Sequence, residues 1–128
     1  MYQVCTCRLR VNFYRKLRDK ADVAFKDDMV LKWINHDVRL QAVCGHSDDS
    51  LICILDERYM FSGDTLLSIP TVTRLPKGSS KGFWEEDMPM LMKMNVDAVY
   101  PGHGVKGCIK DMLNVNIAVR PEKYMVRS

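Results

Sequence analysis

The sequence contains no apolar run that approaches the about 20 residues needed to cross a bilayer, so we expect no membrane-spanning segment. It also has no internal repeat and no low-complexity tract, which excludes collagen-like and coiled-coil architectures. Its five cysteines are odd in number and match no disulfide framework, and its N-terminus has no apolar core of a secretion signal. We therefore expect reduced thiols and a cytoplasmic location.

What remains is an ordinary globular composition: 128 residues, of which 47% are hydrophobic and 27% charged. The net charge of +3 is uneven, because residues 1–40 carry nine basic and only five acidic side chains. This basic excess could contact nucleic acid, but a solvated helix face is the interpretation we favour, so we expect no nucleic-acid partner. Cys5 and Cys7 form a Cys-x-Cys pair, but no second pair completes a tetrahedral metal site.

Hydrophobic patterning predicts strands in hairpins, followed by helices, and therefore a layered α/β or α+β sheet. Asn35-His36-Asp37 supplies turn chemistry between the first two strands, and Phe83 and Trp84 are expected to pack a helix onto the sheet. The methionines of that helix, from Met88 to Met94, fit adaptable core packing better than a partner surface. The expected strands are 29–34, 38–43, 51–55, 59–62 and 96–100, the expected helices are 80–94 and 106–119, and a long loop covers 66–79.

Three short segments share one form, in which a metal-capable side chain follows an apolar strand and lies beside glycine. Glycine allows close backbone approach, and strand ends are where a sheet presents functional groups. Imidazole together with carboxylate suits zinc, iron or manganese. The segments are Val43-Cys44-Gly45-His46-Ser47, Phe61-Ser62-Gly63-Asp64-Thr65-Leu66 and Tyr100-Pro101-Gly102-His103-Gly104.

These three segments together resemble the last three motifs of the metallo-β-lactamase-fold superfamily of metal-dependent hydrolases, over about residues 28–118. The resemblance implies the C-terminal half of an αββα sandwich. It also implies two zinc ions, with manganese or iron as alternatives. In that reading His46 binds the first metal, His103 binds the second, and Asp64 bridges them.

The implied activity is hydrolysis of a small molecule by a metal-activated water that attacks an ester, thioester or phosphoester bond. A bridging Asp64, where the best-known antibiotic-cleaving lactamases have Cys, points toward these broader hydrolases. Ser47, Ser50 and Thr65 could hydrogen-bond the metal ligands, or they could simply cap the turns.

The superfamily's largest metal motif, His-x-His-x-Asp-His, does not occur, because the histidines are His36, His46 and His103 alone. We favour an N-terminally truncated hydrolase; the alternatives are one half of a split enzyme and an inactive remnant or interaction module of the same fold. The chain is thus expected to be one partial domain over 1–128, inactive by itself and with weak or absent metal binding, and no motif assigns 1–27. We also expect an exposed apolar sheet face that a partner chain or self-association covers.

Overall fold

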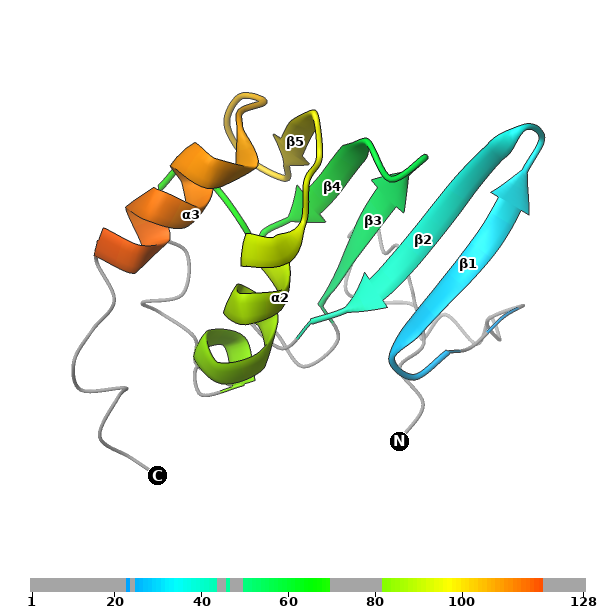
Figure 1. Cartoon of the computed structure of the whole chain (residues 1–128), viewed down its shortest axis with the longest axis horizontal. Coiled ribbons are helices and arrows are strands. Elements are labelled where there is room, and N and C mark those ends of the chain that lie inside the picture. Colours follow the sequence, from blue (N-terminus) through cyan, green and yellow to red (C-terminus); the bar gives the residue numbers. More distant parts are fainter. Residues whose placement is uncertain (1–22, 24, 44–45, 47–49, 70–81, 119–128) are drawn as a thin grey trace, which may run out of the picture.

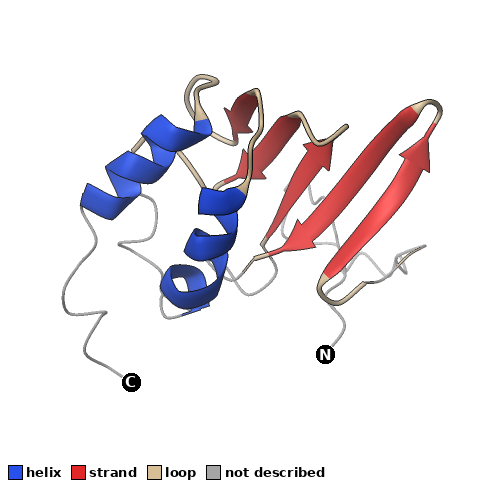
Figure 2. Ribbon diagram, in the orientation of Figure 1, coloured by secondary structure: helices blue, strands red, loops and turns tan. Residues whose placement is uncertain are grey.

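A computed structural model describes residues 23, 25–43, 46, 50–69 and 82–118, which form one sheet with helices on one side of it (Figures 1 and 2). The strand order in the five-stranded sheet is β1-β2-β3-β4-β5. The predicted mixed α/β class is confirmed. The elements are β1 Asp28–Trp33, β2 His36–Ala42, β3 Leu51–Leu55, β4 Tyr59–Gly63, the π-helical turn η2 Phe83–Asp87, α2 Met88–Lys93, β5 Ala98–Pro101 and α3 Ile109–Ala118.

The direction of the strands decides which loops meet. Neighbouring strands from β1 to β4 are antiparallel, whereas β5 runs parallel to β4. Strands β2, β4 and β5 therefore run in the same direction, and their carboxyl ends lie at the same end of the sheet. The three segments singled out in the sequence follow these three strand ends.

The hydrophobic core lies between the sheet and the helices. Alternate residues of β3 and β4 point toward the helices, and Ile52, Ile54 and Met60 are almost completely buried there. Phe83 and Trp84 join the same core and contact each other edge to face, with ring centroids 5.3 Å apart. The predicted packing of these two aromatic residues against the sheet is confirmed.

The helix before β5 begins with a π-helical turn, which runs directly into α2, and Pro89 lies just after the point where the two meet. Met88 is buried, and Met90 and Met94 pack against the core, so most of the methionine run serves the core as predicted. Met92 is the exception, because it is 60% exposed.

The turn predicted at residues 35–37 is placed wrongly. Trp33 pairs with His36, so Ile34 and Asn35 form the loop, and both His36 and Asp37 belong to β2. Ile34 adopts a φ of 57°, a conformation that β-branched residues rarely take. An isoleucine at this position therefore did not indicate a turn. The predicted strand 96–100 and helix 106–119 are observed as Ala98–Pro101 and Ile109–Ala118.

Several sequence predictions lie outside the described residues. They concern Cys5, Cys7, the basic N-terminal segment, Ser47 and most of the loop expected over 66–79. Within the residues that the structure describes, no helix is both long and apolar enough to cross a bilayer.

Candidate metal centre

The candidate site consists of His46, Asp64 and His103. The three loops bring these residues together at the carboxyl ends of β2, β4 and β5. His46 comes from the loop after β2, Asp64 directly follows β4, and His103 follows β5. The Asp64 carboxylate lies between the two imidazoles. Its Oδ2 is 3.6 Å from Nε2 of His46, and its Oδ1 is 3.4 Å from Nε2 of His103.

Backbone hydrogen bonds close each of the three loops at its base. The N–H of Val43 donates to the Ser50 carbonyl at 3.0 Å, below the loop that carries His46. Val99 and Gly107 exchange two hydrogen bonds of 2.9 Å, below the loop that carries His103. The N–H of Thr65 donates to the Ser62 carbonyl at 3.0 Å, which closes the turn around Asp64. These hydrogen bonds hold the base of each loop against the sheet.

Residues 62 to 66 form a turn held by a buried serine. The Ser62 hydroxyl donates to the Leu66 carbonyl at 2.7 Å, and Ser62 is completely buried. Gly63 has a φ of 53°, which favours glycine at this position. Thr65 is also buried, at the same turn. The turn directs the Asp64 side chain away from the core, and one third of it is exposed (33%).

Gly102 lets the loops after β4 and β5 approach each other. Its N–H donates to the Gly63 carbonyl at 2.7 Å, which extends the parallel pairing beyond β5. A Cβ atom at Gly102 would lie 2.8 Å from Oδ1 of Asp64 and 3.1 Å from the carbonyl carbon of Gly63. Only glycine therefore fits without displacing the carboxylate. The sequence motif singled out Gly102, but it did not predict that Gly102 lies this close to Asp64.

The two N–O separations fit ligands that share a metal ion better than a direct hydrogen bond. Hydrogen bonds between nitrogen and oxygen are usually about 2.7–3.2 Å long. Two ligand atoms of a tetrahedral zinc ion, each bonded at about 2.0–2.1 Å, lie about 3.3–3.4 Å apart. The separations of 3.4 and 3.6 Å are close to that edge length. Because each histidine faces a different oxygen, the geometry fits two ions bridged by one carboxylate.

Among the described residues, no group of three or more His, Cys, Asp and Glu side chains is placed to hold one metal ion. Both histidine side chains are accessible, at 49% for His46 and 79% for His103, so further ligands or a substrate could reach them.

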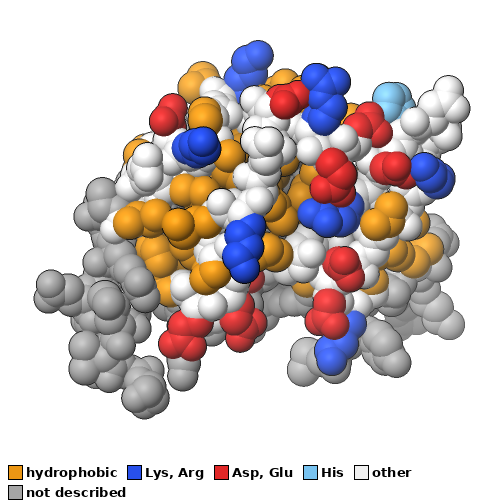
Figure 3. Space-filling model, in the orientation of Figure 1, with side chains coloured by type: hydrophobic (Ala, Val, Ile, Leu, Met, Phe, Trp, Pro, Cys, Tyr) orange, Lys and Arg blue, Asp and Glu red, His pale blue; other side chains and the backbone are white. Residues whose placement is uncertain are grey.

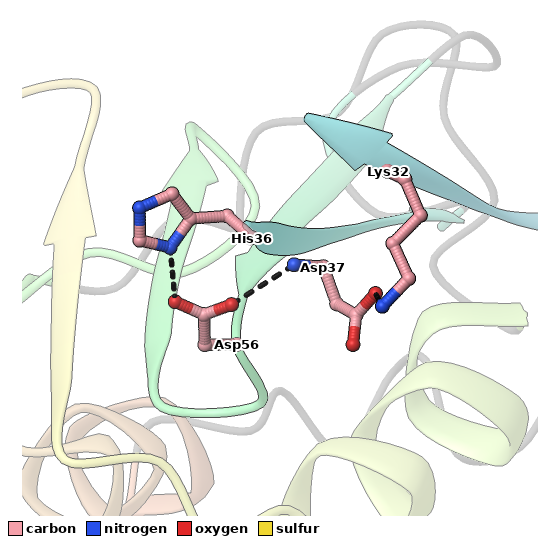
Figure 4. A network of polar contacts seen from close by, with 4 residues as sticks. All are labelled: Lys32, His36, Asp37 and Asp56. Carbon is pink, nitrogen blue, oxygen red and sulfur yellow. Dashed lines mark hydrogen bonds and ion pairs between the residues drawn. The ribbon is translucent and has the colours of Figure 1, made fainter. Parts of the chain in front are cut away.

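His36 is the first residue of β2, at the opposite end of the sheet, and takes no part in this site. Its Nδ1 is 2.7 Å from Oδ2 of Asp56, and the backbone N–H of Asp37 donates to Oδ1 of the same carboxylate at 2.9 Å (Figure 4). These two hydrogen bonds, that with His36 first, lower the pKa of Asp56 below its ordinary value. Lys32 pairs with Asp37 alongside. The network pins the turn after β3 to the start of β2.

Comparison with protein-family models finds no match to this chain, and comparison with curated proteins finds none either. The geometry of the site and the resemblance of its three motifs are thus what point to a function.

Proposed function

We propose that this chain supplies the carboxylate-bridged part of a two-metal hydrolase site of the metallo-β-lactamase type. The observation that supports this most is the position of Asp64, whose two oxygens face two different imidazoles at 3.4 and 3.6 Å. The three residues also lie at the carboxyl ends of their strands, which is where ligand sites of open α/β sheets are found.

In this proposal His46 and Asp64 would hold one zinc ion, and His103 and Asp64 would hold the other. Such ions would supply a water molecule of lowered pKa and polarise the scissile bond of an ester, thioester or phosphoester. The absence of a side chain at Gly102 leaves room for the carboxylate, and Ser62 hydrogen-bonds within the turn that carries it. The two ions have four protein ligand atoms here, so binding is weak and hydrolysis requires the ligands of the absent His-x-His-x-Asp-His motif.

The αββα sandwich belongs to this proposal as well. The described residues form one helix layer and one sheet, and the face of the sheet away from the helices is mostly apolar, as a face covered by a second sheet would be. A second candidate function, an inactive interaction module of the same fold, draws on this apolar face and requires no metal.

Zinc titration of the purified chain tests the proposal, with His36→Ala as the matched control. His46→Ala and His103→Ala should each lower zinc affinity by at least about 10–100-fold. That is the loss expected for removing a group that only supports a metal ligand. His36→Ala removes the same side chain from the opposite end of the sheet and should leave affinity unchanged. Equal losses in all three variants, or no zinc binding by the wild-type chain, would contradict the proposal; the second result would favour the interaction module.

Hydrolysis is tested separately, because the complete site needs more ligands than this chain has. The zinc-loaded chain should show at most traces of thioesterase or phosphoesterase activity. A longer chain or a partner that carries His-x-His-x-Asp-His should restore it, and Asp64→Asn should abolish the restored activity. Restored activity that survives Asp64→Asn would refute the bridging role.

A further inference from the structure

The side of the sheet that points away from the helices forms one continuous surface, which we call the open face. Cross-strand partners lie on the same face of a sheet, so the strand registers assign its members. They contrast with Ile52, Ile54 and Met60, which point toward the helices. The members of the open face are Met29, Leu31, Trp33, His36, Val38, Leu40, Ala42, Leu51, Cys53, Leu55, Tyr59, Phe61, Ala98 and Tyr100.

None of the strand residues that form the open face is Lys, Arg, Asp or Glu. Two charged side chains from the turn after β3 lie at its border, with Arg58 over the Tyr59 ring and Asp56 hydrogen-bonded to His36. The opposite side of β1 and β2 is different, because it presents Lys32, Asp37 and Arg39, with ion pairs from Lys32 to Asp37 and from Arg39 to Glu57. Charged side chains gather where these two strands lie in Figure 3, which shows the helix side of the molecule. The sheet is thus polar where it extends past the helices on one side, yet apolar across its whole width on the other.

None of the open-face side chains is fully buried. Trp33 is 62% exposed, Phe61 45% and Leu31 38%, and the others except the exposed His36 are partly exposed. Phe61 stacks on Tyr100 with ring centroids 5.3 Å apart, so two aromatic rings present a joint apolar surface. Contiguous apolar surface of this extent is typical of an interaction site.

We propose that the open face is the interface of a symmetric dimer, in which it packs against the open face of a second copy of this chain. This inference does not depend on the metal site. The dimer would have four layers, with the two sheets face to face, about 10 Å apart, and the helices outside.

The available area suits this occupant. With aromatic side chains of about 150–250 Å², the exposed fractions of the open face leave about 600 Å² accessible per copy. Two copies would bury about 1,200 Å², which reaches the lower end of the range for specific interfaces. A twofold contact brings each patch against itself, and its strand side chains carry no charge that would repel the second copy. Arg58, which lies over the Tyr59 ring, is paired with Asp97.

Sedimentation equilibrium of the full 128-residue chain, at about 1–100 μM, tests the dimer. The wild-type chain should approach twice its monomer mass of 14.8 kDa. Leu31→Lys combined with Phe61→Lys should return the monomer mass over the same concentrations. Trp33→Lys alone, at a side chain too exposed to matter for folding, should raise the dimer dissociation constant at least about tenfold.

Val30→Lys is the matched control, because Val30 neighbours Leu31 on the same strand, is 58% exposed and points to the other side of the sheet. It should leave the dimer intact. Circular dichroism confirms that each variant keeps its fold. A wild-type monomer with native circular dichroism, a polydisperse aggregate, or a dimer that Val30→Lys weakens as much as Trp33→Lys would each overturn the proposal.

Discussion

Replacing Gly102 by alanine tests whether close contact between the loops after β4 and β5 builds the candidate site. The added methyl group would lie 2.8 Å from Oδ1 of Asp64, 3.1 Å from the carbonyl carbon of Gly63 and 3.2 Å from its oxygen. Two of these three atoms belong to the backbone, so a side-chain rotation alone cannot relieve the overlap. The loop after β5 must move away, and the 2.7 Å hydrogen bond from Gly102 to Gly63 weakens with it.

The magnitude follows from these contacts. Overpacking a well-packed site costs about 1–3 kcal/mol, and alanine recovers about 0.4–1 kcal/mol by restricting the unfolded chain. We therefore expect Gly102→Ala to lower the free energy of unfolding by about 1–2 kcal/mol, measured by urea denaturation. Because the methyl group displaces the Asp64 carboxylate, zinc affinity should fall by at least about tenfold as well.

Two other glycines serve as controls. Gly107→Ala places its methyl group 2.8 Å from Cε of Met112, the far end of a flexible side chain, so its stability should change by less than about 1 kcal/mol. Gly63→Ala meets no atom within 4 Å but has a φ of 53°, so it should cost about 1–2 kcal/mol from backbone strain alone. A Gly102→Ala variant with wild-type stability and wild-type zinc affinity would refute the reasoning.

Three further predictions concern stability. Ile34→Gly should raise the free energy of unfolding by about 1 kcal/mol in urea denaturation, because it removes a β-branched residue from a φ of 57°; a destabilised variant would show that no strain is stored there. The lowered pKa of Asp56 contributes stability above its unfolded value near 3.8, and that stability is lost as the pH falls through the lower folded value. Asp56→Asn should therefore flatten the acid limb of a stability–pH profile, whereas an unchanged limb would exclude this carboxylate. Phe83→Ala should cost about 3–5 kcal/mol by leaving a cavity between sheet and helices, and a loss below about 1 kcal/mol would place Phe83 outside the core.

Much of the sheet was predictable because its strands are apolar runs bounded by turn residues. Leu51–Leu55 was predicted with its observed bounds, since turn-forming residues flank a short buried run. The turn between β1 and β2 was predicted at residues 35–37 instead of 34–35, because Ile34 occupies a turn position that its side chain disfavours.

Of the candidate site, only the three side chains that lie together could be predicted from the sequence. His46, Asp64 and His103 each follow a strand and stand beside or near glycine, which is a local signal. The roles of Ser62 and Gly102 arise from contacts across the turn and between two loops. Such contacts depend on the parallel pairing of β4 with β5, which are separated by a long stretch of chain, and no local pattern reveals them.

The central claim is that Asp64 shares metal ions with His46 and His103, and anomalous X-ray scattering at the zinc edge tests it most directly. Crystals of the chain grown with zinc should show anomalous density beside Nε2 of His46 and Nε2 of His103, within coordination distance of the two Asp64 oxygens. Density only at the cysteines or beside His36, with none at Asp64, would contradict the account.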